Sequence, residues 1–369
     1  MQVCEGKMIF DDVLEIKNGR NQKNVKNPNG KYPIYGSGGI MGYADDYICE
    51  AGTVIIGRKG SINNPIYVEE PFWNVDTAFG LSAKREILMP RYLYYFCQYF
   101  DFERLNKAVT IPSLTKSDLL KIELELPTIE TQKKIVDRLI KVEQIIQLKK
   151  RELQKLDTLV KSRFVEMFGD IITGKYNYKI RKLGDVAFIG SSHRVFTTEF
   201  VESGIPFYRG TEIGELANGI EPSEPYYISE EHYNKLTKDN TKPRIGDLLM
   251  PSICNKGQIW MVDTDRPFYY KDGRVLCISP NRDIFNSKYL EYFMRIKTLV
   301  EYPKLGSGST FAEFKIFLLK DMDVLVPPRN VQNQFADFVA SVDKSKSKIQ
   351  KSLEETQLLF DSLMQKYFG

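Results

Sequence analysis

The feature that most constrains the fold is a long segment, Thr131–Phe168, that contains neither glycine nor proline. Its apolar residues recur at alternating steps of four and three. That spacing holds one seam of a long helix against a partner helix. At roughly 1.5 Å per residue, the helix would be about 57 Å long. The residues predicted to form its seam are Ile135, Leu139, Val142, Ile146, Leu153, Leu156 and Val160.

The chain supplies the partner helix itself, because the same pattern returns 200 residues later. The second predicted seam consists of Phe335, Val339, Val342, Ile349, Leu353, Phe360 and Leu363. Other residues repeat at the same distance: Gln132 corresponds to Gln332, and the Leu-Pro pair before the first helix corresponds to a Val-Pro pair before the second. A repeat of this length indicates two copies of one domain-plus-helix unit.

Short apolar runs before each helix have the turn residues and alternation of β-strands, as in Thr53–Ile56 and Asp247–Met250. One shorter helix per copy is expected near Pro90–Leu105 and Asn286–Tyr302. The second copy also contains 21 extra residues (194 minus 173, the two repeat distances) between Tyr208 and Gly246. We therefore expect each globular part to be mixed but mostly β.

The domain limits follow from this pattern. Because the two ends of a domain usually lie close together, the second helix should run back along the first. We predict an α+β fold with two mostly β domains, two long helices that form an antiparallel coiled coil, and an internal pseudo-twofold repeat. The predicted domains are residues 1–127 and 170–327, and the predicted helical segments are residues 128–169 and 328–369.

The sequence offers few groups for catalysis. It has only two histidines, no GxxxxGK[ST] nucleotide loop, and five widely spaced cysteines without zinc-site spacing. The 52 basic and 48 acidic residues nearly balance, so the net charge of +4 permits nucleic-acid binding but does not require it. No apolar stretch approaches the ~18 residues of a membrane span. We expect a cytoplasmic protein without catalytic or metal-binding residues and with buried, reduced thiols.

Polar and basic loops between the strands remain as candidate DNA contacts, because their side chains can donate to phosphates and base edges. Ordinary solvated loops are the alternative for each residue. The strongest signal is the recurrence of Lys59-Gly60 as Lys256-Gly257 after a matched strand. The candidates are Lys23, Lys31, Ser37, Arg58, Lys59, Ser61, Thr110 and Ser113 in the first copy, and Arg194, Arg209, Thr211, Ser252, Asn255, Lys256, Ser307, Ser309 and Thr310 in the second.

The whole plan resembles the specificity subunit of type I restriction-modification systems. The helix openings LPTIETQKKI (126–135) and VPPRNVQNQF (326–335) resemble that family, as do the domain starts FDDVLEIKNGR (10–20) and KLGDVAFIGSS (182–192). The chain departs from the commonest helix opening, because Thr131 and Val331 stand where an acidic residue often precedes the glutamine.

The resemblance implies a non-catalytic DNA reader with two target-recognition domains that read a bipartite, asymmetric target. It implies a complex with two modification subunits, which use S-adenosylmethionine to methylate adenine, and two motor-nuclease subunits, which use ATP with magnesium for restriction. A coiled-coil adaptor without DNA binding and a stand-alone enzyme remain the competing hypotheses. DNA binding by the assembled complex would exclude the adaptor, and activity of the purified chain alone would indicate the enzyme.

Overall fold

The structure is a computed structural model, and it describes residues 6–107, 110–239, 242–305 and 312–369. The chain folds into two compact units. Unit 1 consists of Met1–Leu153 and Lys348–Gly369, and unit 2 consists of Gln154–Ser347. Both long helices cross from one unit to the other. Each unit therefore holds one globular part together with one portion of each long helix, rather than a domain followed by its own complete helix.

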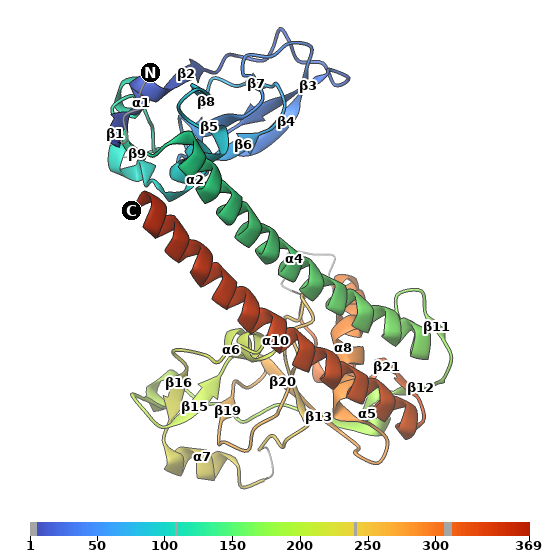
Figure 1. Cartoon of the computed structure of the whole chain (residues 1–369). Coiled ribbons are helices and arrows are strands. Elements are labelled where there is room, and N and C mark those ends of the chain that lie inside the picture. Colours follow the sequence, from blue (N-terminus) through green and yellow to red (C-terminus); the bar gives the residue numbers. More distant parts are fainter. Residues whose placement is uncertain (1–5, 108–109, 240–241, 306–311) are drawn as a thin grey trace. The chain divides into compact units, whose positions relative to one another are not determined.

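The globular part of unit 1 contains three sheets (Figure 1). The largest has the order β2-β8-β5-β6, and the second has the order β4-β3-β7, with β3 and β7 parallel. Strands β1 and β9 form an antiparallel pair. The elements are β1 (Gly6–Ile9), α1 (Phe10–Val13), β2 (Leu14–Asn18), β3 (Tyr32–Gly36), β4 (Gly39–Ala44), β5 (Thr53–Gly57), β6 (Ile66–Val68), β7 (Trp73–Asn74), β8 (Ala78–Ala83), α2 (Pro90–Tyr99), the 3-10 helix η1 (Phe102–Leu105), α3 (Lys116–Leu119) and β9 (Glu123–Leu126).

Unit 2 repeats this topology, with one strand added to its second sheet. Its main sheet is β13-β20-β17-β18, its second sheet is β14-β16-β15-β19 with β15 and β19 parallel, and β12 pairs with β21 as β1 does with β9. The elements are β10 (Gly169–Asp170), β11 (Lys175–Tyr176), β12 (Lys179–Lys182), α5 (Leu183–Val186), β13 (Ala187–Gly190), η2 (Thr197–Glu199), β14 (Phe200–Val201), β15 (Ile205–Tyr208), α6 (Gly210–Leu216), β16 (Tyr226–Ile228), α7 (Glu230–Leu236), β17 (Leu248–Pro251), β18 (Trp260–Met261), β19 (Tyr269–Tyr270), β20 (Val275–Pro280), α8 (Ser287–Glu301), η3 (Tyr302–Leu305), α9 (Ile316–Lys320) and β21 (Asp323–Val326).

The extra residues of the second copy form α6 and α7. Strand β16 pairs antiparallel with β15 as β4 pairs with β3, so these two strands correspond. Helix α6 lies in the sequence before β16 and helix α7 lies after it, and neither has a counterpart among the described elements of unit 1. Helix α6 lies against β17 of the main sheet and β15 of the second sheet, and the main sheet keeps four strands as in unit 1.

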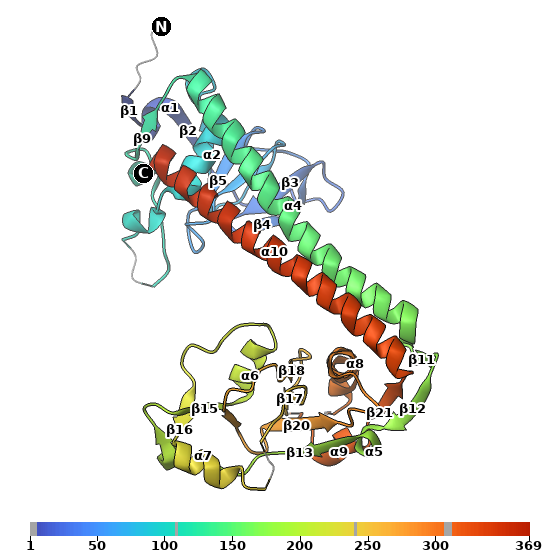
Figure 2. The same ribbon diagram turned by 60° about the horizontal axis from the view of Figure 1, so that its bottom comes forward.

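The long helices are α4 (Ile129–Phe168) and α10 (Arg329–Phe368), and they pack side by side in both views (Figures 1 and 2). In unit 1, Leu139 of α4 and Met364 of α10 belong to one buried cluster. In unit 2, the later part of α4 meets the earlier part of α10, with the Phe164 and Phe335 ring centres 5.4 Å apart. The helices are therefore antiparallel, and the predicted α+β fold with its internal repeat is confirmed.

The seam positions show graded burial. Ile135, Leu139, Val142, Ile146, Val160, Phe335, Val339 and Val342 are buried, whereas Leu153, Leu156, Ile349, Leu353, Phe360 and Leu363 are half-buried. Polar contacts join the helices where apolar residues are fewer. Lys149 Nζ donates to the Ser352 carbonyl oxygen at 3.1 Å, and Lys346 Nζ lies 2.6 Å from Asp157 Oδ1.

A buried glutamine fixes the start of each long helix to its globular part. Gln132 and Gln332 are both fully buried. Gln132 Oε1 accepts from Met89 N at 2.8 Å, while its Nε2 donates to the Ile87 and Pro127 carbonyl oxygens, each at 2.8 Å. Gln332 makes the equivalent bonds to Asn286 N, Ile284 O and Pro327 O. Each glutamine thus ties the first turn of its helix to the loop before α2 or α8.

Candidate nucleic-acid interface

The end of the main sheet in unit 1 brings several predicted DNA contacts together. Strand β5 ends at Gly57, and the loop that follows is held by the segment before α3. Leu114 N donates to Arg58 O and Gly60 N donates to Pro112 O, each at 3.0 Å, while Lys59 pairs with Ser113 in an isolated bridge. Two loops that are far apart in the sequence are therefore one surface in the fold.

Ser37 joins the same surface through Gly57. A Cβ atom on Gly57 would lie 2.2 Å from the Ser61 carbonyl oxygen and 3.1 Å from Ser37 Cβ. Only glycine allows so close an approach. The predicted residues Ser37, Arg58, Lys59, Ser61 and Ser113 therefore form one group, which we call the unit 1 loop cluster.

The unit 1 loop cluster is basic. Arg58 and Lys59 are exposed, and within the described chain no carboxylate forms an ion pair with either. Arg58 Cζ lies 5.7 Å from the centre of the Phe79 ring, so an aromatic face supports the guanidinium. Exposed cations with no internal partner remain able to bind phosphate or guanine.

The other predicted contacts of unit 1 lie apart from this cluster. Lys23 and Lys31 flank the segment that bridges to β4 through Lys26 and Ala44. Both lysines are exposed, and Lys31 Nζ lies 5.3 Å from the centre of the Tyr32 ring. Thr110 is exposed in the loop before Ser113. These residues form the outer part of the candidate surface rather than its centre.

Unit 2 has the same backbone arrangement with different side chains. Ser252 N donates to Arg274 O and Phe314 N donates to Ser252 O, each at 2.8 Å. In unit 1, Arg58 makes the same two bonds: its N donates to Thr77 O, and its O accepts from Leu114 N. A Cβ atom on Gly210 would lie 3.3 Å from Pro251 Cβ. Gly210 and Pro251 are therefore neighbours in unit 2, as Ser37 and Gly57 are in unit 1. The equivalent of Arg58 is therefore Ser252.

This register corrects two expectations. Ser252 is only 2% exposed, so its side chain cannot reach a DNA helix and the residue has a structural role instead. The equivalent of Lys59 is Ile253, and Lys256 lies three residues further along. The two Lys-Gly pairs therefore do not occupy equivalent positions, although Gly60 and Gly257 both have a positive φ, of 80° and 67°. They resemble one another because each lies at a left-handed turn, which favours glycine.

Arg209 is held firmly at the start of α6. Its side chain pairs with Glu212, and its Cζ lies 4.5 Å from the centre of the Tyr226 ring. Burial acts to raise the pKa of Glu212, but hydrogen bonds from Arg209 outweigh it and hold that pKa below its ordinary value. The side chain of Arg209 is 39% exposed. It is therefore a pre-oriented cation with its outer edge open to solvent.

The other predicted contacts of unit 2 that the structure describes are exposed. Arg194 Nε lies 3.2 Å from Asp272 Oδ2, and 69% of the Arg194 side chain is exposed. Thr211, Asn255 and Lys256 are also exposed. Ser307, Ser309 and Thr310 lie outside the described residues.

Two arginines at the same sheet ends were missed in the sequence. Arg20 is exposed just after β2, where its backbone is fixed because Arg20 O accepts from Trp73 Nε1 at 3.0 Å. Arg274 is exposed just before β20 and forms an ion pair with Glu313. Arg274 directly precedes β20, and Arg20 follows β2 after one residue. Each arginine stands next to a glycine, and that position was the signal that the sequence offered.

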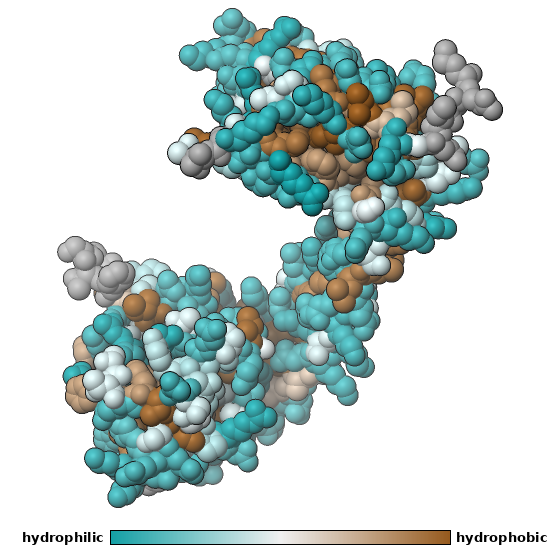
Figure 3. All heavy atoms as spheres, turned by 90° about the vertical axis from the view of Figure 1, so that its left-hand side faces the viewer, coloured by the Kyte–Doolittle hydropathy of each residue, from teal (hydrophilic) through white to brown (hydrophobic). Residues whose placement is uncertain are grey.

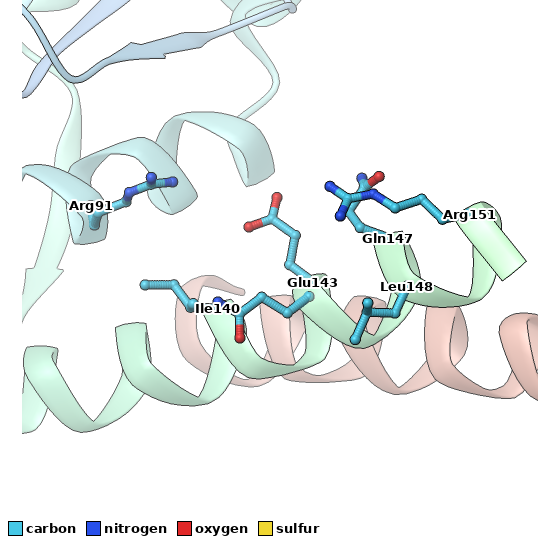
Figure 4. A pocket seen from close by; sticks show the side chains of 7 residues that line it. Arg91, Ile140, Glu143, Gln147, Leu148 and Arg151 are labelled. Carbon is cyan, nitrogen blue, oxygen red and sulfur yellow. The ribbon is translucent and has the colours of Figure 1, made fainter.

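A groove of about 510 Å³ runs beside α4 in unit 1 (Figure 4). Arg91 extends from α2 on one side, and Glu143, Gln147 and Arg151 rise from α4 on the other. Tyr95 OH donates to Glu143 Oε2 at 2.9 Å; burial first, and then this carboxylate, raise the pKa of Tyr95. Leu148 lines the groove and is 59% exposed. The groove is thus a mixed polar and apolar surface between α2 and α4, and its lining residues are not those of the unit 1 loop cluster.

The described cysteines are buried and free: Cys49, Cys97, Cys254 and Cys277. Burial raises the pKa of Cys49 and of Cys277 to about 12, so these thiols stay protonated. Cys4 lies outside the described residues.

Among the described helices, none combines the length and apolar character needed to cross a bilayer. The face shown in Figure 3 is largely hydrophilic, with apolar side chains in separate patches.

The chain is similar to known proteins over most of its length. The family model described as "Type I restriction modification DNA specificity domain" matches residues 7–158 and again residues 175–356. A type I restriction enzyme specificity subunit of Methanocaldococcus jannaschii is 22% identical over 345 residues, which cover 85% of this chain and 76% of that protein. A putative type I specificity subunit of Mycoplasma pneumoniae is 30% identical over 142 residues, which cover 36% of this chain and 46% of that protein.

A solved structure shows the same fold. The type I restriction-modification S subunit from M. genitalium matches with a TM-score of 0.61 at 17% sequence identity, covering all of this chain (100%) and 97% of that one.

Proposed function

The chain belongs to the type I restriction modification DNA specificity family, and we propose that its two units read the two unlike halves of an asymmetric DNA target. It is a specificity subunit with two target-recognition domains. Its family is non-catalytic in general, and it works in a complex with DNA and with other restriction-modification subunits. An adaptor that does not bind DNA is not favoured by this membership.

One observation carries the proposal of unlike half-sites. The main-sheet ends of the two units share their backbone pairing but not their side chains. Arg58 and Lys59 of unit 1 correspond to Ser252 and Ile253 of unit 2, and Arg209 of unit 2 stands directly before α6, a helix without a counterpart among the described elements of unit 1. Base identity is read by side chains that contact base edges. A shared scaffold with different side chains supports two readers of different sequence.

The assembly we propose follows the family plan. Two modification subunits would bind the specificity subunit and methylate adenine with S-adenosylmethionine, and two motor-nuclease subunits would use ATP with magnesium for restriction. The groove between Arg91 and Leu148 supports a helix-side docking surface for a modification subunit, because it combines apolar and charged side chains. The chain itself would hold no cofactor in this scheme.

A domain exchange tests the proposal. Residues 1–127 are replaced by the same region of a relative, and the methylated sequence is determined in cells that carry the complete system. We expect one half of the methylated motif to change and the other half to remain. The donor must keep aromatic residues at Tyr92 and Phe96, because both rings contact Phe368 of α10. The reciprocal exchange of residues 175–326 is the control and should change the opposite half. A change in both halves after either exchange would contradict two independent readers.

A second prediction concerns single lysines. Lys59→Ala should weaken DNA binding by the assembled methyltransferase, because Lys59 is an exposed cation of the unit 1 loop cluster. If Lys59 contacts a phosphate, the slope of log affinity against log salt concentration should decrease in magnitude by about one, with little change in the preferred DNA sequence. If it contacts a base, we expect a loss of roughly 1–3 kcal/mol and relaxed selection at one position of one half-site. Lys256→Ala should act in the same way on the other half-site.

The matched control is Lys7→Ala, which removes an exposed lysine from β1 beside β9. Binding would be measured over a range of salt concentrations. Equal affinities and slopes for the Lys59→Ala, Lys7→Ala and unmodified complexes would assign Lys59 to the solvated surface.

A further inference from the structure

The hydroxyl group of Tyr233 on α7 is buried, and it has no hydrogen-bond partner among the residues that the structure describes. The residue is only 6% exposed, and its ring meets the Tyr269 ring edge-on with centres 6.3 Å apart. Buried polar groups in proteins are nearly always hydrogen-bonded, so such a hydroxyl calls for a specific explanation.

Tyr233 lines a pocket of about 290 Å³. Lys242, Arg244 and Arg266 also line the pocket, together with one acidic residue, Asp265. Three positive charges and one negative charge leave a net charge of two positive. The Phe268 ring adds an apolar wall. Three cationic residues, an aromatic wall and the tyrosine with the unpartnered hydroxyl group therefore border one pocket.

The three cations are not neutralised within the described chain. None of the ion pairs there involves Lys242, Arg244 or Arg266. The backbones of the two arginines are nevertheless fixed: Arg244 N donates to Asp247 Oδ2 at 2.9 Å, and Arg266 N donates to Thr264 Oγ1 at 3.1 Å. Like charges gathered on a fixed frame repel one another unless an anion lies between them.

Part of the pocket lining comes from a segment that has no counterpart among the described elements of unit 1. Helix α7 and residues 242–245 lie in the connection between β16 and β17, whereas β4 and β5 of unit 1 are joined by residues 45–52 without a helix. This part of the lining therefore belongs to the segment that distinguishes the second recognition domain from the first.

We infer that this pocket binds a phosphate group, with the Tyr233 hydroxyl and the three cations as donors to its oxygens. Phosphate presents several strong acceptors, and arginine donors match its geometry. The volume exceeds that of phosphate alone and leaves room for an attached sugar or base. The phosphate could come from the backbone of bound DNA or from a free nucleotide, and both sources share this chemistry.

Calorimetric titration of the full chain with inorganic phosphate tests the site without DNA. We expect saturable binding that Tyr233→Phe weakens about tenfold, because hydrogen bonds to charged groups are the stronger ones. Arg266→Gln should weaken it by a similar factor. The matched controls are Tyr227→Phe, a half-buried tyrosine of β16 outside the pocket, and Lys235→Gln, an exposed cation of α7 outside the pocket. Both should retain the original affinity.

Thermal unfolding distinguishes loss of binding from loss of folding. Removal of an unpartnered buried hydroxyl should leave the unfolding temperature of the phosphate-free chain unchanged or raise it. The proposal is overturned if phosphate does not bind saturably, or if Tyr233→Phe leaves its affinity unchanged in a folded chain.

Competition identifies the source of the phosphate, and this arm alone rests on the proposed DNA-reading function. If DNA supplies the phosphate, target DNA bound to the assembled methyltransferase should displace inorganic phosphate, and Tyr233→Phe should weaken DNA binding. If a free nucleotide supplies it, deoxyadenosine monophosphate should bind more tightly than phosphate and should remain bound when DNA is added. Either result supports a phosphate site, and failure of the DNA arm alone would leave the calorimetric result standing.

Discussion

A fragment that ends at Gly169 will form a closed dimer rather than a folded monomer. It keeps the first globular part and all of α4, but it loses α10. In the full chain, Met364 of α10 is buried in the core of unit 1, and Phe360 and Phe368 pack against that core. Each large apolar side chain left in water costs at least ~1 kcal/mol. A monomer would expose these core surfaces together with the α4 seam, at a total of several kcal/mol.

A second copy of the fragment offers side chains that can replace those of α10. Val160, Phe164 and Phe168 stand 200 residues before Phe360, Met364 and Phe368. In unit 2 they are buried against the second globular part, so this end of α4 already has the apolar character needed. Two identical helices in antiparallel contact are related by a twofold axis, which closes the assembly as a dimer.

The polar contact of Lys149 can also be replaced. In the full chain its Nζ donates to the Ser352 carbonyl oxygen. The residue 200 positions before Ser352 is Glu152. Each Lys149 of the dimer would therefore face Glu152 of the other copy and form an ion pair. This pairing should help the dimer more at low salt than at high salt.

Sedimentation equilibrium would measure the mass of the fragment, and methylation-site sequencing with modification subunits would measure its target. We expect a dimer and a palindromic target built from the first half-site and its inverted repeat. The matched variant Phe164→Asp with Phe168→Asp should abolish the dimer. A folded monomer, or a dimer that still directs methylation to the asymmetric target, would contradict the interpretation of the repeat.

Replacement of a single buried glutamine will destabilise one unit and spare the other. Gln132→Ala removes an acceptor from Met89 N and donors from the Ile87 and Pro127 carbonyl oxygens. A buried donor or acceptor left unpaired costs about 1–3 kcal/mol, so we expect unit 1 to lose roughly 3 kcal/mol or more. Because α4 begins at this contact, the attachment of the helix should be affected first.

Hydrogen exchange resolved along the chain would measure this effect unit by unit. Protection should fall in α2 and the first turns of α4 for Gln132→Ala, and in α8 and the first turns of α10 for Gln332→Ala. The matched control is Gln144→Ala, an exposed glutamine on the same helix as Gln132. Equal exchange in Gln132→Ala and Gln144→Ala would mean that the glutamine does not hold the helix.

The repeat was visible in the sequence because it rests on burial. Seam residues and strand residues must be apolar at fixed spacing, so the matches at a distance of 200 residues survive in both copies. Gln132 could also be singled out in the sequence, because it recurs as Gln332. Its three hydrogen bonds could be identified only in the structure. The helix starts at Ile129, inside the predicted segment 128–169 and two residues before Thr131, and Thr128 Oγ1 caps its first turn by accepting from Thr131 N at 3.3 Å.

The candidate site was less predictable, because polar loops carry no periodic signal. Lys59 is exposed and Ser252 is buried, although both follow a buried strand in the sequence. The pairing of Lys59 with Ser113 joins segments more than fifty residues apart. The helices α6 and α7 are short. Ile213 of α6 packs with residues of both sheets, and Tyr233 of α7 packs with residues of the second sheet, but each apolar pattern is too brief to distinguish from a loop.

The division of the long helices between the units has a consequence for the order of events during synthesis. Unit 2 is one continuous segment, Gln154–Ser347, whereas unit 1 needs Lys348–Gly369 in addition to Met1–Leu153. Domains generally fold as units while the chain emerges from the ribosome. The globular part made first must therefore wait for residues such as Met364 to enter its core, so the second recognition domain can mature before the first.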